Sequence, residues 1–196
     1  MAIIVNKEEK RRNIALSCQT LLLENGIENL TVAQIAKTAG VGKGTIYEYF
    51  SNKEDIVFEI ISTFIVIHEE RLEEICSERM PLKQKLFHFF NLLFESEESR
   101  RHLVLYKEFL AISLLQGSEE MLHFSEVCRQ RFQQILDRML SIAVESGEIP
   151  PSHTLDSHAL LLFATGLVID SRLQSVQPEK EIERFLQMIL GEHVCI

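Results

Sequence analysis

The sequence contains no tryptophan, only four prolines among its 196 residues, and no apolar run of the ~18 residues that a membrane span needs. Its four cysteines, Cys18, Cys76, Cys128 and Cys195, lie far apart and form no C-x-x-C pair. Such spacing argues against zinc and disulfide frameworks, so we expect small buried hydrophobic side chains rather than redox sensors. No segment has the charged-then-apolar pattern of a signal peptide. We therefore predict a soluble, cytoplasmic protein without a membrane partner.

The signatures of common enzymes are also missing. The sequence has no G-x-S-x-G, no phosphate-binding Walker loop, no G-x-G-x-x-G and no H-E-x-x-H. A di-iron bundle needs two E-x-x-H motifs, and only Glu120 to His123 fits. His153, Asp156 and His158 have a spacing that suits a metal but that is common by chance. We predict no enzyme activity, no cofactor and no metal site.

The formal net charge of −9 is distributed unevenly. Residues 1–55 contain seven Lys or Arg and seven Asp or Glu, so this part is neutral and the whole deficit lies in the remaining chain. An acidic body would be repelled by DNA and would orient a neutral head towards it. The same distribution fits many soluble proteins, so charge alone neither establishes nor excludes a nucleic-acid partner.

Helical periodicity covers almost the whole chain, with no convincing strand and no internal repeat. Glycine and proline mark the breaks, most clearly from Gly147 to Ser152. The pattern predicts helices at residues 7–25, from 53, from Pro81 in a first turn, from about 103, from about 119, at 155–176, and from Pro178.

The segment at residues 31–54 is the most specific part of the chain, and it reads TVAQIAKTAGVGKGTIYEYFSNKE. Thr31 and Gln34 form a T-x-x-Q capping box at a helix start. Gly40 supplies a corner at which that helix can stop. These features predict a short helix followed by a tight turn.

A second short helix follows the turn. Ile46 and Phe50 place an apolar stripe four residues apart, and Ser51 with Glu54 predicts a capping box for the next helix. Two short helices around a glycine turn form a helix-turn-helix, whose second helix enters the DNA major groove. The segment therefore predicts DNA binding.

This segment resembles the DNA-binding signature of the TetR family of bacterial one-component repressors. The matching residues are Thr31, Val32, Ile35, Ala36, Ala39, Gly40, Val41, Lys43, Gly44, Thr45, Tyr47, Tyr49, Phe50, Lys53 and Glu54. One departure is Gly42, where the family usually has serine as the cap of the recognition helix. Glycine is a tolerated cap, at a cost of a few tenths of a kcal/mol.

The resemblance implies an all-α fold with two parts. A three-helix helix-turn-helix head would occupy residues 1–52, and a ligand-binding and dimerisation body of about six helices would occupy 53–196. The DNA-binding residues it implies are Thr31, Lys43, Gly44, Thr45, Tyr47, Tyr49 and Lys53. Lys10 and Arg11 either add contacts to the DNA backbone or belong to a solvated helix face.

The resemblance also implies a small-molecule pocket in the body. Twelve phenylalanines and no tryptophan favour a lipophilic effector. The predicted lining residues are polar or aromatic groups that interrupt apolar stripes: Phe89, Tyr106, Phe109, Ser113, Phe132 and Phe163. The alternative interpretation is that each of these residues is an ordinary side chain of the hydrophobic core.

The last two helices are apolar over more than one face, which fits either core packing or a dimer interface. TetR-like proteins pair through these helices, so the resemblance favours a homodimer through Leu160, Phe163, Leu167, Phe185 and Ile189. A two-fold dimer would present two recognition helices to a pseudo-palindromic operator. We predict a repressor that a lipophilic effector releases from its operator; the alternative is a helical ligand-binding or adaptor dimer without specific DNA binding.

Overall fold

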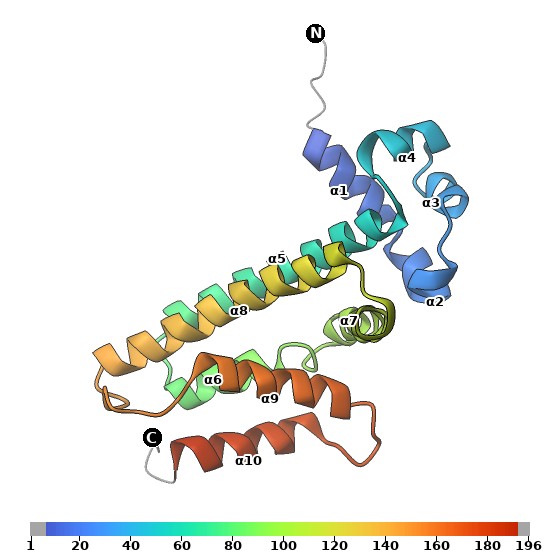
Figure 1. The fold of residues 1–196 in the computed structure, drawn as a ribbon. Coiled ribbons are helices and arrows are strands. Elements are labelled where there is room, and N and C mark those ends of the chain that lie inside the picture. Colours follow the sequence, from blue (N-terminus) through green and yellow to red (C-terminus); the bar gives the residue numbers. More distant parts are fainter. Residues whose placement is uncertain (1–6, 192–196) are drawn as a thin grey trace. The chain divides into compact units, whose positions relative to one another are not determined.

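The computed structural model describes residues 7–191, and every regular element among them is a helix (Figure 1). This confirms the all-α prediction for the described residues. The helices are α1 (Lys7–Ser17), α2 (Gln19–Asn29), α3 (Val32–Thr38), α4 (Lys43–Tyr49), α5 (Lys53–Ser77), α6 (Leu82–Asn91), α7 (Glu97–Gln116), α8 (Glu119–Glu145), α9 (Ser157–Asp170) and α10 (Pro178–Leu190).

The described helices group into two compact units. Among the described residues, unit 1 contains 7–66 together with 104–116, and unit 2 contains 67–103 and 117–191. Helices α5 and α7 each contribute residues to both units. The predicted division at residues 52 and 53 concerns what each part does, and it stays a prediction.

Unit 1 begins with two helices where the sequence predicted one from residue 7 to 25. Helix α1 ends at Ser17, and α2 begins beyond Cys18 and extends to Asn29. Gly26 interrupts the helical path of α2 with φ +76°, a left-handed conformation that favours glycine. A Cβ at this position would also lie 2.7 Å from Glu108 Oε1. The predicted stop at Gly26 is therefore a local break, after which one further turn follows.

The caps of the short helices agree with the sequence except at one point. Thr31 and Gln34 form the predicted capping box of α3, and Gly42 precedes α4 as its cap. The predicted box of Ser51 and Glu54 is wrong by one residue. Asn52 Oδ1 accepts from the Asp55 amide at 2.8 Å, and Asp55 Oδ2 accepts from the Ser51 amide at 2.8 Å. Asparagine caps helices as well as serine does, so the sequence pattern could not separate the two registers.

Unit 2 is built around α6, which packs against α10 and α8, while α8 also packs against α9. Two ion pairs join the unit 2 part of α5 to α8, from Glu69 to Arg131 at 2.6 Å and from Glu73 to Arg138. Pro81 stands at the cap of α6 rather than in its first turn. Glu148 accepts from the Leu82 amide at 2.6 Å in place of a side-chain cap.

The end of the chain follows the predicted order with shorter elements. Helix α9 ends at Asp170, six residues before the predicted end, and Pro178 opens α10 as predicted. Among the helices within residues 7–191, none combines the length and apolar character of a membrane span. Cys195 lies outside the described residues.

Candidate nucleic-acid interface

Helices α3 and α4 form the predicted helix-turn-helix. Gly40 takes φ +67° in the turn between them, and the Val41 amide donates to the Ala36 carbonyl at 3.0 Å. The inner faces of both helices are apolar and covered, with Ile35 0% and Ile46 1% exposed. This packing leaves the other faces of α4 open to solvent.

The open faces of α4 carry most of the predicted DNA-binding residues. Lys43, Gly44 and Tyr47 are exposed, and the Tyr47 side chain retains 62% of its accessible surface. Thr45 and Tyr49 are half-buried. A Cβ on Gly44 would meet no atom of the described chain within 4 Å, so nothing within this chain requires a glycine there. An exposed large aromatic residue beside a lysine is a surface suited to bases and phosphates.

Thr31 and Lys53 lie outside α4, and both make contacts within the chain. The Thr31 side chain is exposed while its hydroxyl caps α3. Lys53 Nζ donates to the Glu28 carbonyl at 2.8 Å and to the Ile27 carbonyl at 3.5 Å. A lysine that binds the last carbonyls of a helix stabilises its C-terminus. Lys53 therefore has a structural role that its sequence position did not reveal.

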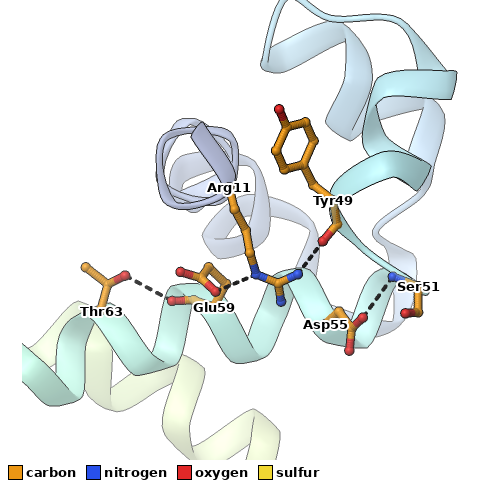
Figure 2. Close-up of polar contacts among 6 residues, drawn as sticks. All are labelled: Arg11, Tyr49, Ser51, Asp55, Glu59 and Thr63. Carbon is orange, nitrogen blue, oxygen red and sulfur yellow. Dashed lines mark hydrogen bonds and ion pairs between the residues drawn. The ribbon is translucent and has the colours of Figure 1, made fainter. Parts of the chain in front are cut away.

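Arg11 is also engaged inside the chain. Its guanidinium lies between α4 and α5, where Nε donates to Glu59 Oε2 at 2.8 Å and Nη1 donates to the Tyr49 carbonyl (Figure 2). The guanidinium also lies 4.5 Å from the centre of the Phe50 ring. Lys10 Nζ lies 5.8 Å from the centre of the Tyr49 ring. The sequence left open whether Lys10 and Arg11 belong to a solvated helix face or contact the DNA backbone. Because both side chains have partners within the chain, neither lies on a freely solvated face.

The part of α7 in unit 1 holds three of the predicted ligand residues. Phe109 is 2% exposed and meets Phe58 edge-on, with ring centres 6.0 Å apart. Tyr106 and Ser113 are half-buried on the same helix. Glu108 Oε1 accepts from the Ile27 amide at 2.6 Å, which attaches α7 to the chain just after Gly26.

The other three predicted ligand residues belong to an aromatic cluster in unit 2. We define this aromatic cluster as Phe89, Phe90, Phe132, Phe163 and Phe185. Phe89 meets Phe132 edge-on with ring centres 6.3 Å apart, and Phe90 meets Phe163 at 5.1 Å. Phe163 and Phe185 stack with 3.7 Å between ring centres. Phe185 was predicted from the sequence only as a dimer-interface residue, although its position on the apolar stripe of α10 also fits this cluster.

The predicted dimer residues differ in their exposure. Leu160 and Leu167 are 2% and 5% exposed in the single chain, so their own unit already covers them. Phe163, Phe185 and Ile189 are half-buried. The large apolar side chains of α9 and α10 that remain exposed are those of Leu162, Ile169 and Met188, with 55%, 43% and 73% exposed.

The comparisons with known proteins agree with this geometry. Residues 20–60 match the bacterial regulatory proteins of the tetR family. The chain is 30% identical over 159 residues to the fatty acid metabolism regulator protein of Bacillus subtilis, covering 81% of this chain and 80% of the relative. The chain belongs to the TetR family. It is therefore a DNA-binding transcriptional regulator, as the helix-turn-helix predicted.

Solved structures of TetR-family proteins share the fold. FadR from Bacillus subtilis, crystallised with stearoyl-CoA, is 26% identical with a TM-score of 0.68, over 91% of this chain and 97% of that one. A TetR-family regulator from Cytophaga hutchinsonii has a TM-score of 0.75 at 13% identity, over 95% and 96% of the two chains. At that identity the likeness concerns the fold alone.

The cysteines within residues 7–191 of this TetR-family regulator are poor candidates for redox chemistry. Cys18 and Cys76 are buried, as predicted. Burial raises the pKa of both thiols, and it raises the pKa of Cys128 to about 11. A raised pKa keeps the thiol protonated, and the thiolate is the reactive form.

His153, Asp156 and His158, whose spacing would suit a metal, lie in a segment where two of them make local backbone contacts. Asp156 caps α9 by accepting from the amides of His158 and Ala159. His153 Nδ1 accepts from the Leu155 amide at 3.0 Å. Among residues 7–191, no three His, Cys, Asp or Glu side chains form a group that could hold a metal ion.

Proposed function

We propose that this regulator is a homodimeric cytoplasmic repressor whose α4 helices enter successive major grooves of a pseudo-palindromic operator. The observation that carries the proposal is α4 itself. It buries Ile46 at 1% exposure while Tyr47, the next residue, is 62% exposed. A short helix anchored by one apolar side chain presents its remaining surface to the groove.

The proposal gives different roles to the residues of this surface. Tyr47 and Thr45 would contact base edges or thymine methyl groups, and Gly44 would let the DNA come close to the helix. Lys43, Tyr49 and Thr31 would contact phosphates or lie beside them. Lys53 at the start of α5 would contact a DNA phosphate, in addition to the backbone carbonyls to which it already donates. Residues 1–52 would act as the DNA-binding part and 53–196 as the ligand-binding and dimerisation part.

We propose that the dimer forms through α9 and α10. The three exposed apolar residues Leu162, Ile169 and Met188 support this, because they are open in one chain and lie on these two helices. Phe163, Phe185 and Ile189 would contribute their exposed edges. Leu160 and Leu167 would support the interface from within their own unit, since little of their surface remains to be covered.

The proposed effector is a long-chain acyl thioester. The relative of 30% identity is a fatty acid metabolism regulator, and FadR binds stearoyl-CoA in its crystal structure. A long acyl chain is apolar along its whole length, and the aromatic cluster offers an apolar environment in unit 2. Phe89, Phe132 and Phe163 would line this site, whereas Tyr106, Phe109 and Ser113 belong to unit 1 and stay a sequence prediction. The proposal includes no catalytic step and no cofactor.

The test begins by selecting duplexes from a randomised DNA pool with the purified full chain. We expect enrichment of a pseudo-palindrome, and we expect stearoyl-CoA to release the protein from it while free coenzyme A does not. Release should correspond to a fall in DNA affinity of about 5- to 150-fold. Failure to enrich any sequence would favour the adaptor alternative. Enrichment without release by stearoyl-CoA would reject the proposed effector class and retain the regulator.

A further inference from the structure

Arg11 connects three separate elements through one side chain. It extends from α1, donates through Nε to Glu59 on α5 at 2.8 Å, and donates through Nη1 to the carbonyl of Tyr49, the last residue of α4 (Figure 2). Its plane lies over Phe50, between α4 and α5, at 4.5 Å from the ring centre. Only 32% of the Arg11 side-chain surface and 22% of that of Glu59 remain exposed.

The Tyr49 carbonyl lies at the C-terminal end of α4, where helix α4 itself offers no hydrogen-bond donor. The last carbonyls of a helix have no partner within it, and a cation at this end also interacts favourably with the helix dipole. Helix α4 has only seven residues, of which Ile46 alone is buried, so few contacts fix its direction. Arg11 supplies one of those contacts at the end of α4 that lies next to the corner with α5.

The chemistry of the contact requires arginine. Nε and Nη1 donate from one rigid plane to acceptors on two different elements, a carboxylate on α5 and a backbone carbonyl on α4. A lysine ammonium carries the same charge but lacks this planar fork, so it cannot reproduce both directions at once. The charge of Arg11 is also already paired with Glu59, which reduces what it offers to a phosphate.

We propose that Arg11 is a positioning residue for operator recognition, which sets the orientation of α4 and does not bind DNA phosphate. This inference rests on the proposed function. Base edges are read only when the contacting side chains are held within about 0.5 Å of their productive positions. Loss of the Arg11 contacts therefore reduces discrimination between DNA sequences, whereas the non-specific attraction to phosphates remains.

The experiment measures affinity for two duplexes of equal length, one selected by the parent protein from a randomised pool and one of random sequence. Each is titrated with salt from about 50 to 200 mM, because the slope counts the phosphates that the protein neutralises. The variants are Arg11→Lys, Arg11→Ala and Glu59→Gln. Arg12→Ala is the matched control, since Arg12 is the exposed neighbour on the same helix. Circular dichroism melting confirms that each variant is folded.

We expect Arg11→Lys, Arg11→Ala and Glu59→Gln each to weaken binding to the selected duplex by about tenfold, as for one lost charge-assisted hydrogen bond. Affinity for the random duplex should stay within about twofold of the parent value. The slope of log affinity against log salt concentration should stay within about half a unit of the parent slope. Arg12→Ala should leave the ratio between the two duplexes unchanged.

A phosphate-binding role for Arg11 would give different results. If Arg11 bound phosphate, Arg11→Lys would retain affinity, Arg11→Ala would lower the slope by about one, and Glu59→Gln would free Arg11 and strengthen binding to both duplexes. Any of these results would overturn the inference, as would variants that bind like the parent. If Arg11→Ala did not fold, Arg11→Lys and Glu59→Gln would decide. Failure to select any duplex would count against the proposed function itself, and so is distinguishable from failure of the Arg11 inference.

Discussion

Helices α3 and α4 of unit 1 and the aromatic cluster of unit 2 hold their side chains in place by different means. Helices α3 and α4 have seven residues each, and polar contacts to the backbone hold the start of α3 and the end of α4. Thr31 makes the contact at the start of α3, and Arg11 makes the contact at the end of α4. The aromatic cluster depends instead on rings packed edge-on or stacked.

The difference follows from size. A seven-residue helix cannot bury enough apolar surface to fix its own direction, so hydrogen bonds of about 1 kcal/mol each determine its geometry. A buried ring contributes several kcal/mol through burial alone, with less directional control. Substitutions in the aromatic cluster should therefore change stability. Substitutions of polar residues in α3 and α4 should change the proposed DNA recognition with less effect on stability.

The largest effect is expected for Phe90→Ala in the aromatic cluster. Phe90 is 4% exposed and contacts Phe89, Phe163 and Phe185. Removing a buried ring leaves a cavity and should cost about 3–5 kcal/mol in the free energy of unfolding. Urea denaturation of the parent and the variant measures this. Leu115→Ala is the control, because this side chain is 82% exposed and its loss should change stability by less than about 0.5 kcal/mol. A comparable loss in both variants would contradict the assignment of Phe90 to the core.

A pH-dependent loss of stability is expected from His68. Burial, as the main cause, and the charge of the nearby His102 together lower the pKa of His68 to about 4. His102 lies with Nδ1 3.4 Å from His68 Nε2, and burial lowers its pKa as well, against the opposing effect of Glu98. In the unfolded chain the pKa of His68 returns to its ordinary value near 6.5, so acid favours the unfolded state. The contribution is fully present above pH ~6.5 and is lost as the pH falls towards 4, by roughly 3 kcal/mol.

The measurement compares the urea stability of the parent and His68→Asn between pH 8 and pH 4. Asparagine does not titrate, so the difference between the two proteins isolates His68 from the carboxylates that also protonate in this range. The parent should lose more stability than the variant on acidification. Parallel curves would show that His68 is not held neutral by its surroundings.

Substitution of Tyr47 tests whether a change in α4 affects DNA recognition more than stability. Because it is 62% exposed, Tyr47→Ala should leave the free energy of unfolding nearly unchanged. Binding to a selected operator should weaken by about 1–3 kcal/mol, as for one lost base contact. Fluorescence anisotropy with labelled duplex measures this, and Tyr47→Phe separates the hydroxyl from the ring. A variant that dimerises and binds like the parent would mean that α4 presents a different face to DNA.

The sequence predicted the local features around α3 and α4 well because they depend on neighbouring residues. The Thr31–Gln34 capping box and the helix stop at Gly40 were predicted from the local pattern, and the Gly42 cap from the resemblance to the family. The cap at Asn52 was missed by one residue because Ser51 and Asn52 have nearly equal preference for this position.

Contacts between distant segments could not be predicted in the same way. Arg11 precedes Glu59 by 48 residues, and Ile27 precedes Glu108 by 81. No local pattern distinguishes Arg11, Glu59 or Glu108 from charged residues on a solvated helix face. Leu160 and Leu167 show the same limit for apolar residues, since their stripe fitted a core and an interface equally and only the burial in one chain separates the two.

The smallest effect is expected at the Thr31 cap, where stability and recognition meet in one residue. Thr31 Oγ1 accepts from the Gln34 amide at 3.3 Å, and Gln34 Oε1 accepts from the Thr31 amide at 3.0 Å. Thr31→Ala removes the first of these bonds and should cost about 1 kcal/mol in the free energy of unfolding. Thr31→Ser retains the hydroxyl and should restore most of that loss. If Thr31 only caps α3, both variants should bind a selected operator in proportion to their folded fraction. If its hydroxyl also contacts a phosphate, Thr31→Ala should lose further affinity that Thr31→Ser recovers, and anisotropy measured well below the melting temperature separates these two results.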